Sequence, residues 1–199
     1  MKPTYLADSY DHVKRVLIEA SSSPHWLAAM LLTVPMSKAQ IDGYKTFLRV
    51  DAPRQFLSSP LPLERDHFFQ ALRELADNAK ANILLDPCTG LKMNNRFRPK
   101  MREYLSLSEF VSLSVSSDRL LLCFDQSLSR GLEGADRAAK LAALKSKGVS
   151  GFYFKSHVSF LCASCSVENV KNWANSLFSI GIPNTRLQSN FNLGLRKSV

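Results

Sequence analysis

Glycine, proline, cysteine and histidine are all scarce in this chain. It has 8 glycines, 9 prolines, 4 cysteines and 4 histidines among 199 residues, and 45% of its residues are hydrophobic. Collagenous and low-complexity chains need far more glycine and proline, and disordered chains contain far less apolar material. The composition therefore predicts a globular protein, and its length fits one large domain or two small ones.

Long apolar runs are also missing. The N-terminal residues MKPTYLADSYDH contain no apolar segment of the kind found in secretory signals. The most apolar stretch, Trp26 to Met36, has about 11 residues, whereas a membrane-spanning helix needs about 20. We therefore expect a cytoplasmic protein without a membrane partner, and in that compartment we expect free thiols rather than disulfides.

Acidic residues are too few to balance the basic ones. The 26 lysines and arginines face 17 acids, which gives a formal net charge of +9 and a pI near 9.6. The excess is clustered, because residues 92–102 carry five cations and no acid, and residues 151–199 carry five cations and one acid. This balance favours polyanionic partners, above all phosphate backbones.

The first 80 residues predict four helices, because apolar residues recur there at helical spacing. The first predicted helix follows Ser9, and the second begins at Trp26. The third follows a capping box formed by Ser37 and Gln40, and the fourth covers about residues 63–81.

From residue 104 the apolar period changes to two. Residues 104–115 alternate between apolar residues and serine, and residues 119–125 form a continuous apolar run, so we expect a β-hairpin with its turn at residues 116–118. Helices are then predicted at about 133–147 and 167–180, and strands at about 151–163 and 185–195.

The predicted fold class is α+β or α/β. A helical N-terminal region of about four helices precedes a C-terminal mixed sheet with the order β-hairpin, α, β, α, β. The predicted segments are a helical region at 1–81, a basic connector at 82–103 and a sheet region at 104–199, with one compact domain as the alternative.

The basic connector has the residue types that nucleic-acid contacts need. Its cations can neutralise phosphates, its two asparagines can bond to base edges, and its phenylalanine can stack on an unpaired base. The polar faces of the two last predicted strands could form an open platform for single-stranded nucleic acid, although an ordinary wet sheet face explains them too. The predicted contacts are Lys92, Asn94, Asn95, Arg96, Phe97, Arg98, Lys100, Arg102, Tyr153, Lys155, His157 and Arg186.

The residue patterns of known catalytic sites match this sequence less well than the pattern of a nucleic-acid-binding surface does. Asp125 at the end of a buried strand and Lys155 on the next strand are compatible with a metal-dependent nuclease, but Tyr153 stands where a second carboxylate is needed. His157-Val-Ser159 is typical of phosphoesterases that use two such motifs, and the second motif is missing. The glycine-containing segment SRGLEG lacks the residues of a phosphate loop.

The cysteines offer one metal-binding alternative. Cys162 and Cys165 form a C-x-x-C pair, and Cys88 with Cys123 would complete the four ligands that zinc requires. The spacing is not that of two close pairs. We therefore expect no cofactor, with zinc held by these four thiols as the alternative.

The leading hypothesis is a non-enzymatic protein that binds DNA or RNA as a subunit of a larger nucleoprotein complex. One alternative is a nuclease or phosphoesterase that uses Asp125, Lys155 and His157. The other is a regulatory module that binds an acidic protein partner through its basic surface.

Overall fold

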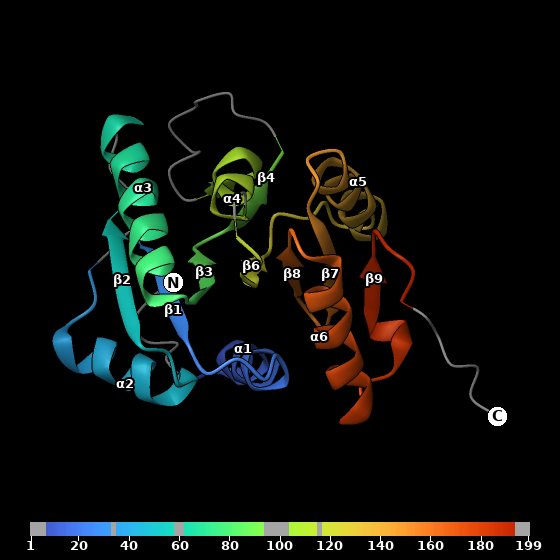
Figure 1. Ribbon diagram of the computed structural model, residues 1–199, viewed down its shortest axis with the longest axis horizontal. Coiled ribbons are helices and arrows are strands. Elements are labelled where there is room, and N and C mark those ends of the chain that lie inside the picture. Colours follow the sequence, from blue (N-terminus) through green and yellow to red (C-terminus); the bar gives the residue numbers. More distant parts are fainter. Residues whose placement is uncertain (1–6, 33–34, 58–61, 94–103, 115–116, 194–199) are drawn as a thin grey trace.

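A mixed sheet of seven strands runs through the computed structural model, which describes residues 7–32, 35–57, 62–93, 104–114 and 117–193 (Figure 1). The strand order is β2-β1-β3-β6-β8-β7-β9. Neighbouring strands are parallel from β2 to β6 and antiparallel from β6 to β9. The strands are β1 (Trp26–Leu32), β2 (Ala52–Leu57), β3 (Asn82–Pro87), β6 (Leu121–Asp125), β7 (Ser150–Lys155), β8 (Ser159–Ser164) and β9 (Leu187–Ser189). A separate parallel pair is formed by β4 (Gly90–Lys92) and β5 (Tyr104–Ser106).

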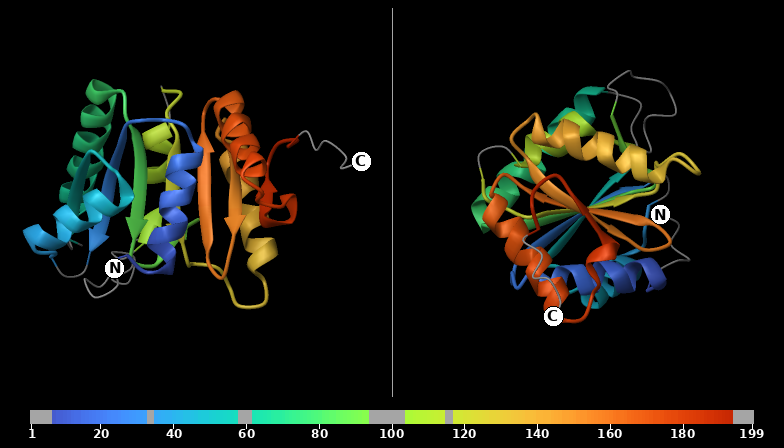
Figure 2. Two further views of the ribbon diagram at one scale, coloured as in Figure 1. Left: turned by 90° about the horizontal axis from the view of Figure 1, so that it is seen from below. Right: turned by 90° about the vertical axis from the view of Figure 1, so that its right-hand side faces the viewer.

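Helices cover both faces of the sheet, as the end-on view of Figure 2 shows. One face carries α1 (Ser9–Ala20), α2 (Lys38–Leu48) and α6 (Val167–Ser179). The other carries α3 (Pro62–Ala79), α4 (Leu107–Ser114) and α5 (Glu133–Lys145). Within the described residues, no helix is both long and apolar enough to cross a bilayer.

Each face of the sheet has its own hydrophobic core. Successive strand side chains point to opposite faces, so Trp26 packs beneath α1 and α6 while Leu27 joins the core beneath α3, α4 and α5. The first and last helices meet directly in the first core, where the Trp173 indole Nε1–H donates to the Leu17 carbonyl at 2.7 Å.

Three of the four predicted N-terminal helices are present, and the second is wrong. The capping box of Ser37 and Gln40 begins α2 as predicted. Residues 26–32, however, form β1, which lies between two parallel neighbours and whose residues 26–31 are buried on both faces. A seven-residue apolar run satisfies a buried strand and a buried helix equally well, so only tertiary pairing distinguishes them.

The predicted hairpin at 104–125 is half wrong. Its second strand is present as β6, but its first strand is limited to β5 and is followed by α4. The helix begins at a capping box, in which the Glu109 backbone N–H donates to Ser106 Oγ at 3.2 Å and the Ser106 N–H donates to Glu109 Oε2 at 2.7 Å. The serine alternation therefore belongs to a capped helix.

The long strand predicted at 151–163 is two strands. Residues 156–158 form a turn between β7 and β8, closed by the Ser156 N–H donating to the Val158 carbonyl at 2.9 Å. Of the strand predicted at 185–195, only Leu187–Ser189 form a strand among the described residues, β9, after a short 3₁₀ turn at Asn184–Arg186; residues 194–195 lie outside the described residues. Helices α5 and α6 lie where they were predicted. The mixed α/β class is confirmed, but the predicted order of elements is wrong.

Five strands end at the same edge of the sheet, which we call the carboxyl edge. β1, β2, β3 and β6 are parallel, and β7 points the same way because it is two antiparallel steps from β6. In open α/β sheets, ligands bind beyond the carboxyl ends of the strands. Asp86 near the end of β3, Asp125 at the end of β6 and Lys155 at the end of β7 all lie at this edge.

Candidate functional site

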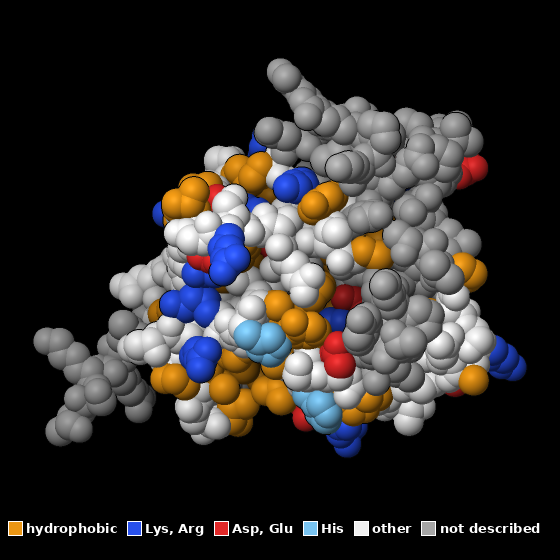
Figure 3. All heavy atoms as spheres, turned by 180° about the vertical axis from the view of Figure 1, so that it is seen from behind, with side chains coloured by type: hydrophobic (Ala, Val, Ile, Leu, Met, Phe, Trp, Pro, Cys, Tyr) orange, Lys and Arg blue, Asp and Glu red, His pale blue; other side chains and the backbone are white. Residues whose placement is uncertain are grey.

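A cleft with a volume of about 540 Å³ opens at the carboxyl edge beside β6, β7 and β8. Three parts of the chain form it: the loop after β6, the first turns of α5, and the β7–β8 hairpin. The lining residues are Asp125, Gln126, Leu128, Glu133, Arg137, Lys155, Ser156, His157, Val158 and Ser159. Figure 3 looks onto this edge, where lysine and arginine side chains gather on the left near a histidine and hydrophobic side chains.

Basic side chains reach the cleft from separate elements. Lys155 and His157 come from the β7–β8 hairpin, and Arg137 comes from α5. The Arg137 guanidinium donates to Gln188 Oε1 at 3.0 Å and to Ser159 Oγ at 3.2 Å, so its orientation is fixed by two strands. His157 is exposed, whereas Arg137 and Lys155 are half-buried. The cleft thus presents one cation, Arg137, with restricted motion.

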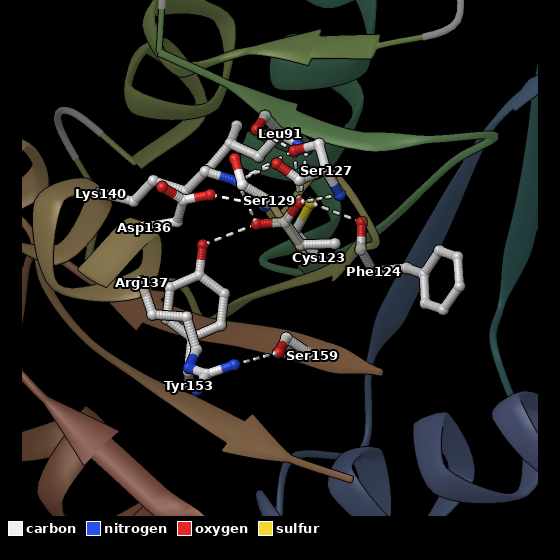
Figure 4. Close-up of polar contacts among 11 residues, drawn as sticks. Leu91, Cys123, Phe124, Ser127, Ser129, Asp136, Arg137, Lys140, Tyr153 and Ser159 are labelled. Carbon is white, nitrogen blue, oxygen red and sulfur yellow. Dashed lines mark hydrogen bonds and ion pairs between the residues drawn. The ribbon is translucent and has the colours of Figure 1, made fainter. Parts of the chain in front are cut away.

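Asp125 lies at the base of the cleft and is fully buried. Its Oδ1 accepts hydrogen bonds from the Leu91 and Ser127 N–H groups, both at 3.0 Å, and from Ser127 Oγ at 2.7 Å (Figure 4). Its Oδ2 accepts from Lys140 Nζ and from the Tyr153 hydroxyl, both at 2.7 Å. Both carboxylate oxygens are therefore occupied, and a metal ion would have to displace Lys140 to reach them.

The Asp125 cluster, which consists of Asp125, Ser127, Lys140 and Tyr153, is charge-balanced. One carboxylate faces one ammonium group, and the Tyr153 hydroxyl donates to the carboxylate. Burial and the adjacent Asp125 carboxylate raise the pKa of Tyr153 well above 10. Tyr153 therefore stays protonated and acts as a hydrogen-bond donor.

A second cluster of similar composition lies on the opposite face of the sheet. In this Asp86 cluster, Asp86 Oδ2 accepts from Lys14 Nζ and from the Tyr44 hydroxyl, both at 2.8 Å, and Lys14 Nζ also donates to Asp11 Oδ1 at 2.9 Å. Burial raises the pKa of Asp11; burial opposes the charge of Lys14, but Asp86 and Asp11 together raise its pKa. Two adjacent parallel strands, β3 and β6, thus each end at a buried Asp–Lys–Tyr cluster.

Sequence reasoning missed both of these clusters. The available signal was an aspartate at the end of each buried apolar run, ILLD and LLCFD, but only Asp125 was predicted as a site residue. Lys14 and Lys140 sit in amphipathic helices and look like surface lysines in the sequence. Their burial depends on the tertiary contact with the aspartates.

The function of this cleft is inferred from its own residues. Comparisons of the chain with protein-family models, with curated proteins and with solved structures each give no match. The charge, burial and hydrogen bonding of the residues at the carboxyl edge are therefore the basis of the inference.

The predicted nucleic-acid contacts other than Tyr153 fall into three groups. Lys155 and His157 line the cleft, and Arg186 is close by, since its Nη1 donates to the Lys155 carbonyl at 3.2 Å. Lys92 ends β4, with Nζ 4.7 Å from the centroid of the Tyr104 ring. The predicted contacts Asn94, Asn95, Arg96, Phe97, Arg98, Lys100 and Arg102 lie outside the described residues.

Tyr153 requires a correction. It is fully buried in the core beneath α5, so it offers no face on which a base can stack. The predicted open sheet platform is wrong for the same reason, because helices cover both faces of the sheet. The predicted basic contacts that remain accessible here, Lys155 and His157, lie at the carboxyl edge.

The four cysteines do not converge. Cys123 and Cys162 point to opposite faces of the sheet, and burial raises the pKa of both thiols well above the usual value. Cys88 follows β3 at the carboxyl edge, whereas Cys165 follows β8, which runs the other way. Within the described residues, no three His, Cys, Asp or Glu side chains are grouped in a way that could hold a metal ion.

Proposed function

We propose that this protein binds nucleic acid by contacting phosphates at the carboxyl-edge cleft. The observation that supports the proposal is the meeting of Arg137, Lys155 and His157, from a helix, a strand and a turn, in one cleft of a chain with net charge +9. Phosphate contacts supply most of the affinity in non-specific nucleic-acid binding.

The geometry of the cations favours phosphate binding. Arg137 is already held by Gln188 and Ser159, so binding an anion costs little additional side-chain entropy. The Glu133 carboxylate in the cleft accepts a hydrogen bond from the Gly131 N–H at 3.0 Å, so this side chain is held against the loop that precedes α5. Backbone hydrogen bonds lower the pKa of Glu133, so it remains ionised. The other carboxylate of the lining, Asp125, is paired with Lys140, which leaves Arg137 and Lys155 facing one carboxylate without a partner cation.

A nuclease or phosphoesterase is the second candidate, because Asp125, Lys155 and His157 do line one cleft. Against a role for Asp125 as a metal ligand stands the complete occupation of both its oxygens by Leu91, Ser127, Lys140 and Tyr153. Turnover of single- and double-stranded DNA and RNA in Mg²⁺ would favour this candidate over simple binding.

The proposal is tested by fluorescence anisotropy with labelled DNA and RNA between about 50 and 200 mM salt. We expect affinity to fall steeply with salt, because cations that contact phosphates release counterions. Lys155→Gln should weaken binding and reduce the magnitude of the salt slope by about 1.

The matched control is Lys145→Gln. Lys145 is exposed at the other end of α5, about 18 Å along the helix from Glu133. Removal of the same charge there should leave binding nearly unchanged. Absent binding, salt-insensitive binding, or equal effects of the two substitutions would overturn the proposal; a protein partner retained after nuclease treatment would favour a protein-binding module instead.

A further inference from the structure

An aromatic pair lies at the rim of the cleft. The His157 ring stacks on the Tyr10 ring with 4.7 Å between centroids and 27° between planes. Tyr10 in turn contacts Phe124, with ring centroids 5.6 Å apart. The pair joins the first turn of α1 to the β7–β8 hairpin, two segments that are far apart in the sequence.

The histidine ring is both supported and accessible. Tyr10 covers one face of the ring, yet the side chain as a whole is exposed and lines the cleft. The turn that carries it is closed by hydrogen bonds between Ser156 and Val158 at 2.9 and 3.1 Å. Val158 also packs against the hydrophobic core, which fixes the turn to the sheet.

We propose that the His157–Tyr10 pair is a stacking site for an unpaired nucleobase, which makes single-stranded nucleic acid the ligand of the cleft. This inference rests on the proposed nucleic-acid binding and specifies its substrate class. Aromatic rings bind single strands by stacking on bases, and every base has a π-face, so the contact does not depend on sequence.

The neighbouring cations fit the same ligand. Lys155 lies two residues before His157, and Arg137 lines the same cleft. A base stacked on His157 brings the phosphates of its own strand towards these side chains. Bases in a duplex have both faces covered by their neighbours, so a duplex can use the cations but not the stacking site.

Three nucleic-acid probes that differ in whether they present unpaired bases test the inference. We compare a single-stranded oligonucleotide, an abasic strand with the same number of phosphates, and a duplex, by anisotropy at constant salt. The wild-type protein should bind the strand with bases at least about fivefold more tightly than the abasic strand, since stacking of one base is worth roughly that much.

Substitutions of single histidines show which residue provides the preference for bases. His157→Ala should abolish the preference for the strand with bases over the abasic strand, and His157→Phe should retain the preference. The control is His12→Ala: His12 is also exposed on α1 and also contacts an aromatic ring, that of Phe47, with centroids 4.9 Å apart. It should behave as the wild type.

The outcomes separate this inference from the proposed function. Equal wild-type binding of the normal and abasic strands, or tighter binding of the duplex, overturns the stacking site while phosphate binding stands. Loss of the base preference in His157→Phe or in His12→Ala also overturns it. If none of the probes binds, the proposed function itself fails.

Discussion

Gly90 lies against the Asp125 carboxylate so closely that a Cβ atom on residue 90 would overlap Oδ1. The same Cβ atom would be 2.7 Å from the Gln126 nitrogen and 2.9 Å from the Ser127 nitrogen. Gly90 also has a φ of +112°, which side chains disfavour. The absence of a side chain lets β4 approach Asp125 and lets the Leu91 N–H reach it.

Gly90→Ala should therefore destabilise the protein by more than about 2 kcal/mol, because it combines backbone strain with a clash against backbone atoms. Urea unfolding measures the change. Gly134→Ala is the matched control: Gly134 lies in α5, and apart from its chain neighbours and the nearby backbone of its own helix, no atom of the described residues comes within 4 Å of the place its Cβ would take. The substitution should therefore stabilise the protein by about 0.5–1 kcal/mol. A Gly90→Ala protein as stable as the wild type would contradict the described packing.

The Lys140–Asp125 ion pair should be sensitive to loss of one partner. Lys140→Met leaves a fully buried carboxylate without its counter-ion and should cost about 3–5 kcal/mol in unfolding free energy. Lys140→Met combined with Asp125→Asn should recover part of this loss, because the uncompensated charge is gone. Arg15→Gln breaks the more exposed pair with Glu19 and should cost less than about 1 kcal/mol. Similar costs at both pairs would contradict the burial of Lys140.

The contribution of Tyr153 to the unfolding free energy should become measurable at alkaline pH. Its pKa is raised well above 10 in the folded protein by burial and by Asp125, whereas the unfolded chain has a tyrosine pKa near 10. A raised pKa contributes stability that is complete below the unfolded value and is lost as pH rises towards the folded one.

Tyr153→Phe should thus flatten the fall in unfolding free energy above pH 10 by up to about 1.4 kcal/mol per pH unit. It should also lower stability at pH 7 by about 1.5–3 kcal/mol, since a hydrogen bond to a charged group is lost. Tyr44→Phe in the Asp86 cluster should flatten the curve in the same way, since its pKa is also raised well above 10. Unchanged slopes in both variants would show that these hydroxyls ionise normally.

Thiol reactivity should divide the cysteines into two pairs. Cys123 and Cys162 are fully buried with raised pKa values, so a thiol reagent should modify them only after unfolding. Cys88 and Cys165 are half-buried and should react first in the native protein. Four thiols that react together, or four that are protected and then released by a chelator, would contradict this division.

Apolar periodicity predicts most helices of the fold but not all of its strands. It places α1, α2, α3, α5 and α6 because each has one buried face. It fails for β1, where a short apolar run buried on both faces carries no period, and it misses β3 for the same reason. The first turn of α4 is readable from the Ser106–Glu109 capping box, but the serine alternation that follows favours a strand instead.

The site is predictable only in part. The positions of Lys155, His157 and Asp125 on predicted strands mark them as site residues, and the structure brings them to one cleft. The turn at Ser156 is not apparent in the sequence, which assigns His157 to a continuous strand and gives no sign of its contact with Tyr10. Stacking between residues nearly 150 positions apart leaves no local pattern in a sequence.

The hydrogen bond between Trp173 and the Leu17 carbonyl has a consequence for biosynthesis. A ribosome makes α1 before the strands, but α6, whose Trp173 satisfies the Leu17 carbonyl, is made only after all of the strands from β1 to β8. The part of α1 that faces α6, including the Leu17 carbonyl, therefore stays uncovered until α6 has been made, and in that interval it can contact chaperones or misassemble. Because Trp26 and Trp173 lie 5.7 Å apart in this region, the intrinsic fluorescence of the protein should report this late closure directly.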